Sequence, residues 1–289
     1  RPKVSSPPVR SSLVPRPRLY QRLNQGLERR LTLVSAPAGY GKTTLLAAWI
    51  TSARIPVAWL TLDREENQPA NFCAYFWYAL ERAASFPDWP PLASVGEIPL
   101  EAALMRMLIS LEQFDQPLAL VLDDYHVINN AVIHQALAAF LERLPPHIHL
   151  LIATRKDPPL PLARLRARGE LVEIRAEHLR FSAEESANFL EQKMGLHLAP
   201  EDTATLTERT EGWAAGLQMA GLSLQEQADP RPFIQSISGS HPFILDYLVE
   251  EVLTMQPAET QRFLLRTSLL RRLSASLCAA LTESEPAVA

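Results

Sequence analysis

The chain has 289 residues, of which 47% are hydrophobic and 21% are charged, and its formal net charge is −4. This length allows one large hydrophobic core and two or three domains. The slight acidic excess argues against a chain that wraps nucleic acid over its whole surface, because such chains are strongly basic. Any contact with DNA would therefore be local.

Cysteine, histidine and hydropathy patterns exclude several further classes. Cys73 and Cys278 lie far apart without metal-ligand spacing, so we expect small buried side chains in a reducing compartment. The seven histidines form no HxxxH or CxxH cluster, which argues against zinc or iron. The apolar runs are too short to span a bilayer, and no secretion signal opens the sequence. We expect a cytoplasmic protein with no membrane partner.

The chain opens with a segment rich in proline, serine and arginine, and we expect residues 1–13 to be a disordered lead-in. Residues 14–178 then alternate helical and strand patterns, which predicts an α/β domain with a doubly wound parallel sheet of about five strands. The expected strands are 31–34, 57–62, 118–124, 149–155 and 171–174. The expected helices are 19–30, 72–84, 100–114 and 131–144, with a proline-rich loop at 87–99.

Residues 31–44, LTLVSAPAGYGKTT, join a buried strand directly to a phosphate-binding loop, although Ala36 replaces the first glycine of the full P-loop pattern. Glycines let successive backbone N–H groups converge on phosphate oxygens, and the helix that follows adds its positive end. Lys42 would reach the β- and γ-phosphates, Thr43 would ligate Mg²⁺, and Thr44 would contact the α-phosphate. The expected nucleotide contacts are Ala38, Gly39, Tyr40, Gly41, Lys42, Thr43 and Thr44.

Two further strands end in polar residues. Residues 118–124, LALVLDD, resemble a Walker B strand, in which Asp123 would hold Mg²⁺ and Asp124 would orient or deprotonate an attacking water. Arg155, at the end of HLLIATR, would sense the γ-phosphate through charge-assisted hydrogen bonds. Ligands of open α/β sheets bind at the carboxyl ends of strands, so we expect one ATP site with magnesium. The alternatives are a strand ending in solvent and a surface arginine.

Beyond residue 178 only helical periodicity remains, and SAEE at 182–185 is a capping arrangement that predicts a helix start. We therefore expect a separate helical domain at residues 179–240. Just before it, Arg164, Arg166 and Arg168 form a short basic helix. They would be either a nucleic-acid patch or a solvated helix surface, and their alternate spacing favours the solvated surface.

The chain resembles the amino-terminal ATPase module of large ATP-binding LuxR-type transcriptional regulators, which belong to the STAND class of signal-transducing NTPases. The resemblance covers most of the chain from Leu13 onward, and its motifs are specific in combination. They are SAPAGYGKTTLLAAW at 35–49, VAWLTLDREENQPANFCAY at 57–75, LVLDDYHVI at 120–128, LLIATRKDPPLPLARLRARGEL at 150–171, LRFSAEE at 179–185 and EGWAAGLQMA at 211–220.

The resemblance implies a switch that binds ADP at rest, takes up ATP after a signal, self-associates and then assembles on DNA. Residues 241–289 would be the truncated start of a winged-helix domain, with DNA bound only through a carboxyl-terminal domain absent here. The resemblance also makes Trp213 and Ala214 candidate nucleotide contacts, although the tryptophan would equally serve as a core anchor at a helix start. Val14 and Pro15, together with Leu13, would cover the adenine in the same way.

The function expected from these observations is an ATP-binding, slowly hydrolysing switch module of a transcriptional regulator. One alternative is a P-loop phosphotransferase, which needs an acceptor pocket and usually a mobile basic lid. Another is a non-catalytic DNA-binding module whose basic surface lies in the helical half of the chain.

Overall fold

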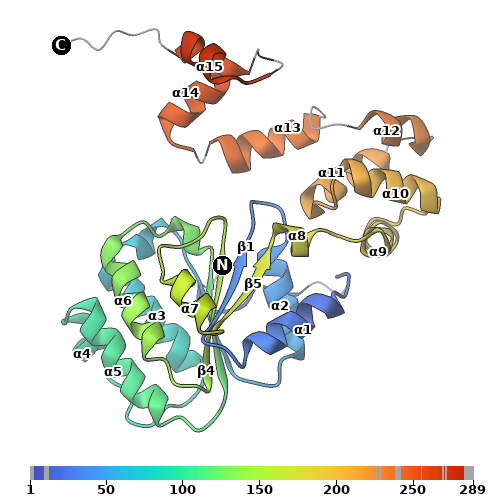
Figure 1. Cartoon of the computed structure of the whole chain (residues 1–289). Coiled ribbons are helices and arrows are strands. Elements are labelled where there is room, and N and C mark those ends of the chain that lie inside the picture. Colours follow the sequence, from blue (N-terminus) through green and yellow to red (C-terminus); the bar gives the residue numbers. More distant parts are fainter. Residues whose placement is uncertain are drawn as a thin grey trace, which may run out of the picture. The chain divides into compact units, whose positions relative to one another are not determined.

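The structure is a computed structural model that describes residues 3–9, 13–225, 227, 229–237, 242–254, 256–268, 270 and 272–282. It contains two compact units, Arg1–Gln235 and Ser236–Ala289, which are considered separately (Figure 1). Parts of the expected lead-in, helical domain and winged helix, namely residues 1, 2, 10–12, 226, 228, 238–241, 255, 269, 271 and 283–289, lie outside the described residues. The expected domain limits at 178/179 and 240/241 stay predictions.

Five parallel strands form the sheet of the first unit, in the order β2-β3-β4-β1-β5. They are β1 (Leu31–Ser35), β2 (Val57–Thr61), β3 (Leu118–Asp123), β4 (Ile148–Thr154) and β5 (Leu171–Arg175). β1, β3 and β4 are buried along their whole length, as their continuous apolar runs require of central parallel strands. The predicted doubly wound α/β fold is confirmed.

Helices cover both faces of this sheet, because alternate strand residues point to opposite faces (Figure 1). On one face, α1 (Pro17–Gly26) and α2 (Lys42–Ser52) pack on side chains such as Val34 and Trp59. On the other, the larger core includes Leu33 and Leu60. Its helices are α3 (Pro69–Ala83), α5 (Leu100–Glu112), α6 (Ala131–Glu142) and α7 (Leu162–Ala167). The loop expected at 87–99 contains one short helix, α4 (Leu92–Gly96).

Residues 3–9 differ from the expected disordered lead-in, because Lys3 is held beside β2. The Thr61 backbone N–H donates to the Lys3 carbonyl oxygen over 2.8 Å. The Lys3 ammonium lies within 3.0 Å of three carboxylates, those of Asp63, Glu65 and Glu66. Glu66 is fully buried, so its charge requires a partner, and Lys3 supplies one. Asp63 and Glu66 also form a capping box on the 3₁₀ turn η1 (Arg64–Asn67).

After the short helix α8 (Ala176–Leu179), the chain is helical. α9 (Ala183–Met194), α10 (Pro200–Arg209), α11 (Ala214–Leu224) and α12 (Pro230–Ser236) follow in order, and α9 packs against α10 and α11. The predicted cap is present: the Ser182 hydroxyl accepts the Glu185 N–H, and the Glu185 carboxylate accepts the Ser182 N–H. The segment formed by α9, α10 and α11 is called the helical domain below.

The described part of the second unit is also helical. It contains α13 (Pro242–Leu248), the π-helical turn η3 (Val249–Leu253), α14 (Ala258–Thr267) and α15 (Ala275–Thr282). Across the ranges that the structure describes, none of the helices has the length and apolar character needed to cross a bilayer.

Candidate functional site

The phosphate loop connects β1 to α2 at the carboxyl end of the sheet. Gly39 and Gly41 have φ values of 77° and 74°. These values lie in the left-handed region, which residues other than glycine rarely adopt. Gly41 is the N-cap of α2, so the helix starts at Lys42 with its unpaired N–H groups and positive dipole end at the loop. This arrangement is suited to binding an anion.

Lys42 is 7% exposed and points into the loop. Its ammonium donates hydrogen bonds to the carbonyl oxygens of Ala36 and Pro37, each at 2.8 Å. Burial lowers the pKa of Lys42 to about 8; the negative charges of Asp124 and Asp123 oppose the shift, and Arg155 adds to it. Lys42, both acidic residues and Arg155 therefore belong to one electrostatic cluster, as the sequence predicts for a nucleotide site.

Thr43 and Asp123 bring the first turn of α2 together with the end of β3. The Thr43 hydroxyl donates to Oδ1 of Asp123 over 3.0 Å. Asp123 is 1% exposed, and burial together with the neighbouring Asp124 charge raises its pKa to about 7. A hydroxyl and a carboxylate oxygen are ligands that Mg²⁺ accepts, and a buried carboxylate of this kind gains from a cation. These two residues fit the magnesium site that the sequence predicts.

Asp124 has a strained backbone. Its φ of 57° lies in the left-handed region, which is uncommon for residues other than glycine and which concentrates at functional sites. The turn after it, η2 (Tyr125–Val127), is anchored by a buried hydrogen bond of 2.8 Å between the Tyr125 hydroxyl and His134 Nδ1. His126 Nδ1 lies 3.7 Å from Oδ1 of Asp124. Nothing in the spacing of these two histidines in the sequence predicts their place beside Asp124.

A polar cavity of about 570 Å³ lies beside the loop. Its walls come from α2, the ends of β2 and β3, the lead-in and the helical domain. They are formed by residues 5–9, Leu13, Thr43, Thr44, Ala47, Thr61, Asp123, Asp124 and Lys193. Arg155 follows β4 and is half-buried, but it is not among the described lining residues of this cavity. The volume falls in the range of small-molecule sites.

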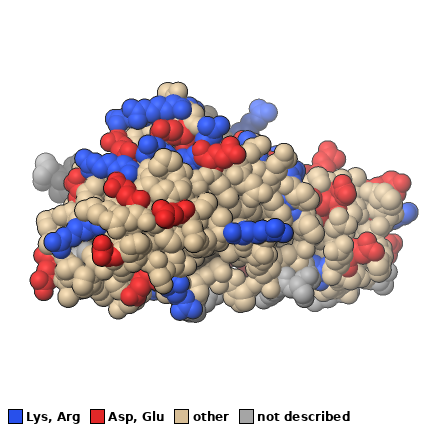
Figure 2. Space-filling view, turned by 90° about the horizontal axis from the view of Figure 1, so that it is seen from below, with Lys and Arg blue, Asp and Glu red and all other residues tan. Residues whose placement is uncertain are grey.

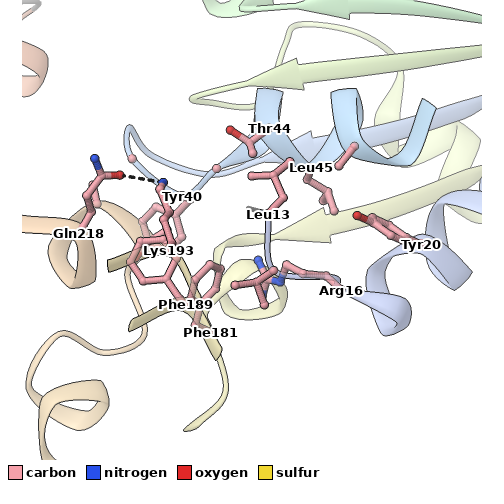
Figure 3. Close-up of a pocket in the computed structure, with 16 residues that line it drawn as sticks. Leu13, Arg16, Tyr20, Tyr40, Thr44, Leu45, Phe181, Phe189, Lys193 and Gln218 are labelled. Atoms are coloured by element: carbon pink, nitrogen blue, oxygen red, sulfur yellow. Dashed lines mark hydrogen bonds between the residues drawn. The ribbon is translucent and has the colours of Figure 1, made fainter. Parts of the chain in front are cut away.

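An apolar cavity of about 260 Å³ adjoins it, and three distant segments form its walls (Figure 3). The first two are the start of the nucleotide domain, with Leu13, Val14, Arg16 and Tyr20, and the loop and α2, with Gly39, Tyr40, Gly41, Thr44, Leu45 and Ala48. The third segment is helical, with Phe181, Phe189, Lys193, Ala214, Ala215 and Gln218. Leu13 and Val14 therefore lie at the cavity, whereas Pro15 is not among its described lining residues.

Arg16 ties the first segment to the third. Its guanidinium donates to the carbonyl oxygens of Leu179 and Arg180 at 2.8 Å and to the Glu185 carboxylate at 3.0–3.2 Å. It also lies 4.6 Å from the centroid of the Phe181 ring. Burial opposes ionisation of Glu185, yet hydrogen bonds from Arg18 and Arg16 hold its pKa below the usual value. The sequence around Glu185 predicts only a helix-capping role for this residue.

Trp213 contacts the phosphate loop. Its indole Nε1 donates to the Ala38 carbonyl oxygen over 3.1 Å, and the Ala215 backbone N–H donates to the Gly39 carbonyl oxygen over 3.0 Å. The preceding Gly212 has a φ of 65°, and a Cβ there would lie 2.5 Å from the Phe181 carbonyl oxygen, so only glycine fits. From the EGWAAGLQMA segment at 211–220, Ala214, Ala215 and Gln218 line the apolar cavity, while Trp213 binds the loop backbone.

Two arginines of the basic helix α7 are paired with acidic residues. Arg164 forms an ion pair with Glu142, and Arg166 forms one of 2.8 Å with Glu173. In the face shown in Figure 2, cationic and anionic side chains are interspersed. These pairs favour a solvated helix surface over a nucleic-acid patch at this position.

Comparison with known proteins gives relatives over nearly the whole chain. The HTH-type transcriptional regulator MalT of Serratia proteamaculans is 37% identical over 285 residues, which cover 97% of this chain and 31% of that protein. MalT of Yersinia enterocolitica is 36% identical over 285 residues, covering 97% of this chain and 32% of that protein. Residues 249–289 match the MalT winged helix domain. The chain spans about a third of the length of these relatives.

Two solved structures share the fold. A STAND protein with a tetratricopeptide repeat sensor from Pyrococcus horikoshii gives a TM-score of 0.61 at 19% identity, over 98% of this chain and 39% of that chain. A Walker-type ATPase of Pyrococcus abyssi gives a TM-score of 0.52 at 15% identity, over 81% of this chain and 73% of that chain. The chain is therefore a homologue of the amino-terminal third of MalT, an HTH-type transcriptional regulator, and has the P-loop fold of STAND ATPases.

Proposed function

We propose that the chain is the ATP-binding, slowly hydrolysing switch module of a MalT-like transcriptional regulator of the cytoplasm. Its ATP or ADP state would control self-association, and through it DNA binding by carboxyl-terminal domains. The observation that carries the proposal is a pair of hydrogen bonds: Trp213 donates to the Ala38 carbonyl oxygen, and the Ala215 N–H donates to the Gly39 carbonyl oxygen. Because these bonds join α11 to the phosphate loop, a shift of the loop backbone on nucleotide binding would also move the helical domain.

The nucleotide would occupy both cavities, with its base in the apolar cavity and its phosphates in the polar one. Lys42 and the N–H groups at the start of α2 would bind the phosphates. Thr43 and Asp123 would hold Mg²⁺, which neutralises phosphate charge. Asp124 would orient or deprotonate the attacking water, and Arg155 would contact the γ-phosphate from the end of β4.

A switch needs a ligand that distinguishes two states, and not a fast reaction. Complete inversion of a two-state population requires a difference of about 5.5 kcal/mol in binding free energy. A γ-phosphate in reach of Lys42, Mg²⁺ and Arg155 would supply charge-assisted contacts that ADP lacks. The phosphotransferase alternative is weaker, because its one candidate basic lid is tied down by Glu142 and Glu173.

The assignment of Lys42 can be tested by thermal unfolding with and without Mg-ATP. At a hundredfold excess over its dissociation constant, ATP should stabilise the wild-type chain by about 2.7 kcal/mol. Lys42→Ala should fold but lose most of this stabilisation, because the cation that binds the β- and γ-phosphates is gone. Lys156→Ala, which removes an exposed lysine, is the matched control and should behave like the wild type. Equal stabilisation of all three proteins would refute the site.

Turnover by the purified chain tests the slow-switch part of the proposal. Kinases turn over at ~1–100 per second. A switch should hydrolyse ATP far more slowly, since its ATP state must last long enough to be read. Sustained hydrolysis in the kinase range would contradict a switch and favour a metabolic enzyme.

A further inference from the structure

Lys193 of α9 lines both cavities. Leu13 and Thr44 line both of them as well. Among the described residues of the polar cavity, Lys193 is the one that the helical domain contributes, and it is also the one cation. Because Thr44 lies in the first turn of α2, the cavities meet beside the phosphate loop. A positive charge from the helical domain therefore stands at this junction.

The Lys193 side chain contacts two neutral groups of the helical domain. Its ammonium lies 4.9 Å from the centroid of the Phe189 ring and 3.4 Å from Oε1 of Gln218 (Figure 3). A hydrogen bond of that length is at the weak end of the range, whereas a phosphate oxygen would offer a shorter, charge-assisted one. The side chain is half-buried on a flexible stem, so small rotations would reach a ligand in either cavity.

Two further cations belong to the elements around the junction, Lys42 at the start of α2 and Arg16 on the wall of the apolar cavity. Lys42 donates to two loop carbonyls, and Arg16 donates to Leu179, Arg180 and Glu185. The polar cavity also contains the carboxylates of Asp123 and Asp124, which repel phosphate unless a metal ion neutralises them. Lys193, on the lining that the two cavities share, would offset this repulsion at the phosphate nearest the ribose.

We infer that Lys193 binds the phosphate nearest the ribose of a bound adenine nucleotide, so that the helical domain contacts the nucleotide by charge as well as by packing. The inference rests on the proposed function, which puts the base in the apolar cavity and the phosphates in the polar one. Thr44, which lines the same junction, marks the α-phosphate end, while Asp124 marks the γ-phosphate end. Lys193 thus distinguishes nucleotides from nucleosides and treats ADP and ATP alike.

The test is calorimetric titration of the purified chain with ADP, ATP and adenosine. Lys193→Gln should weaken ADP and ATP binding equally, by about tenfold, because one charge-assisted contact is lost. Adenosine binding should not change, and Lys193→Arg should retain most of the nucleotide affinity. Arg209→Gln, which removes one positive charge at the end of α10 outside both cavities, should match the wild type.

Each other outcome has a distinct meaning. If the wild-type chain binds neither ADP nor ATP, the proposed function fails and this inference fails with it. If the wild type binds both and Lys193→Gln matches Arg209→Gln, only the inference is refuted. An equal loss for adenosine would show that Lys193 merely shapes the apolar cavity. A loss confined to ATP would place its charge at the γ-phosphate and refute the position inferred here.

Discussion

The polar and apolar cavities are assembled in different ways. In the polar cavity, Thr43 and Asp123 each belong to a short motif at a strand end, and the parallel sheet alone brings them to 3.0 Å. In the apolar cavity, Val14, Tyr40 and Phe189 come from segments that only tertiary packing brings together. The candidate metal site is therefore local to the sheet, whereas base binding depends on how the helical domain packs against it.

This difference bears on regulation. A displacement of the helical domain would leave Lys42, Thr43 and Asp123 in place but would open the wall formed by Phe189 and Gln218. Contacts that hold the helical domain should therefore change nucleotide affinity without altering the metal site. One of these contacts is the ion pair between Arg16 and Glu185, which joins residues 169 positions apart.

Glu185→Ala should have the largest effect, because it leaves the Arg16 guanidinium, whose side chain is 7% exposed, without its carboxylate. Breaking a buried ion pair from one side costs about 3–5 kcal/mol, and the partial exposure here lowers the expected loss to about 2 kcal/mol. The midpoint of thermal unfolding should fall by about 5 °C, and ADP affinity should fall with it.

Two further substitutions separate the ion pair from the helix cap, because the Glu185 carboxylate also accepts the Ser182 N–H. Glu185→Gln keeps an acceptor for the cap but loses the charge, so it should retain part of the stability. Glu184→Ala removes an exposed carboxylate from the same helical turn and should have little effect. Equal losses for Glu184→Ala and Glu185→Ala would show that the ion pair contributes nothing.

The same contrast explains what could be predicted from the sequence. The strands and the sheet follow from apolar runs in the sequence. The contact of Thr43 with Asp123 follows because both residues lie in motifs after such runs, and the carboxyl ends of parallel strands meet at one edge of the sheet. Phe189, Lys193 and Gln218 carry no local signal, since a lysine and an amide on a helix are usually solvated. Only the packing of α9 and α11 against the loop gives them a role.

Residues 3–9 show a second limit of the sequence. Proline and serine indicated disorder, but the long-range pairing of Lys3 with the buried Glu66 outweighs composition. That pairing spans 63 positions, and no local pattern around Lys3 announces it. Charged residues that are partners across such a distance become visible only once β2 and η1 are folded.

The polar cavity should respond to pH through Asp123, whose pKa is raised to about 7. An acid with a raised folded-state pKa keeps its proton after the unfolded chain has lost it. Stability without ligand therefore falls as the pH rises from about 4 to 7. Magnesium needs the ionised carboxylate, so Mg²⁺ affinity should rise about tenfold between pH 6 and pH 8.

Thermal unfolding with ADP and a Mg²⁺ titration at both pH values measures this dependence. Asp123→Asn cannot ionise, so its weaker response to Mg²⁺ should be nearly the same at the two values. The apolar cavity provides the internal comparison, because adenosine binding involves neither magnesium nor Asp123 and should not follow the same profile. A magnesium response of equal strength at pH 6 and pH 8 in the wild type would contradict the raised pKa.

Trp213→Phe should have the smallest effect, and it probes the connection between the two cavities. It removes the hydrogen bond from Nε1 to the Ala38 carbonyl, worth about 1 kcal/mol, while it keeps an aromatic side chain. We expect a drop of about fivefold in ADP and ATP affinity, because a looser α11 no longer fixes the loop. Trp89→Phe is the matched control, since the buried Trp89 Nε1 has no hydrogen-bond partner among the described residues. Both substitutions reduce side-chain volume equally, so a comparable loss of affinity in the two variants would mean that a general loss of packing, and not the bond to Ala38, lowers the affinity.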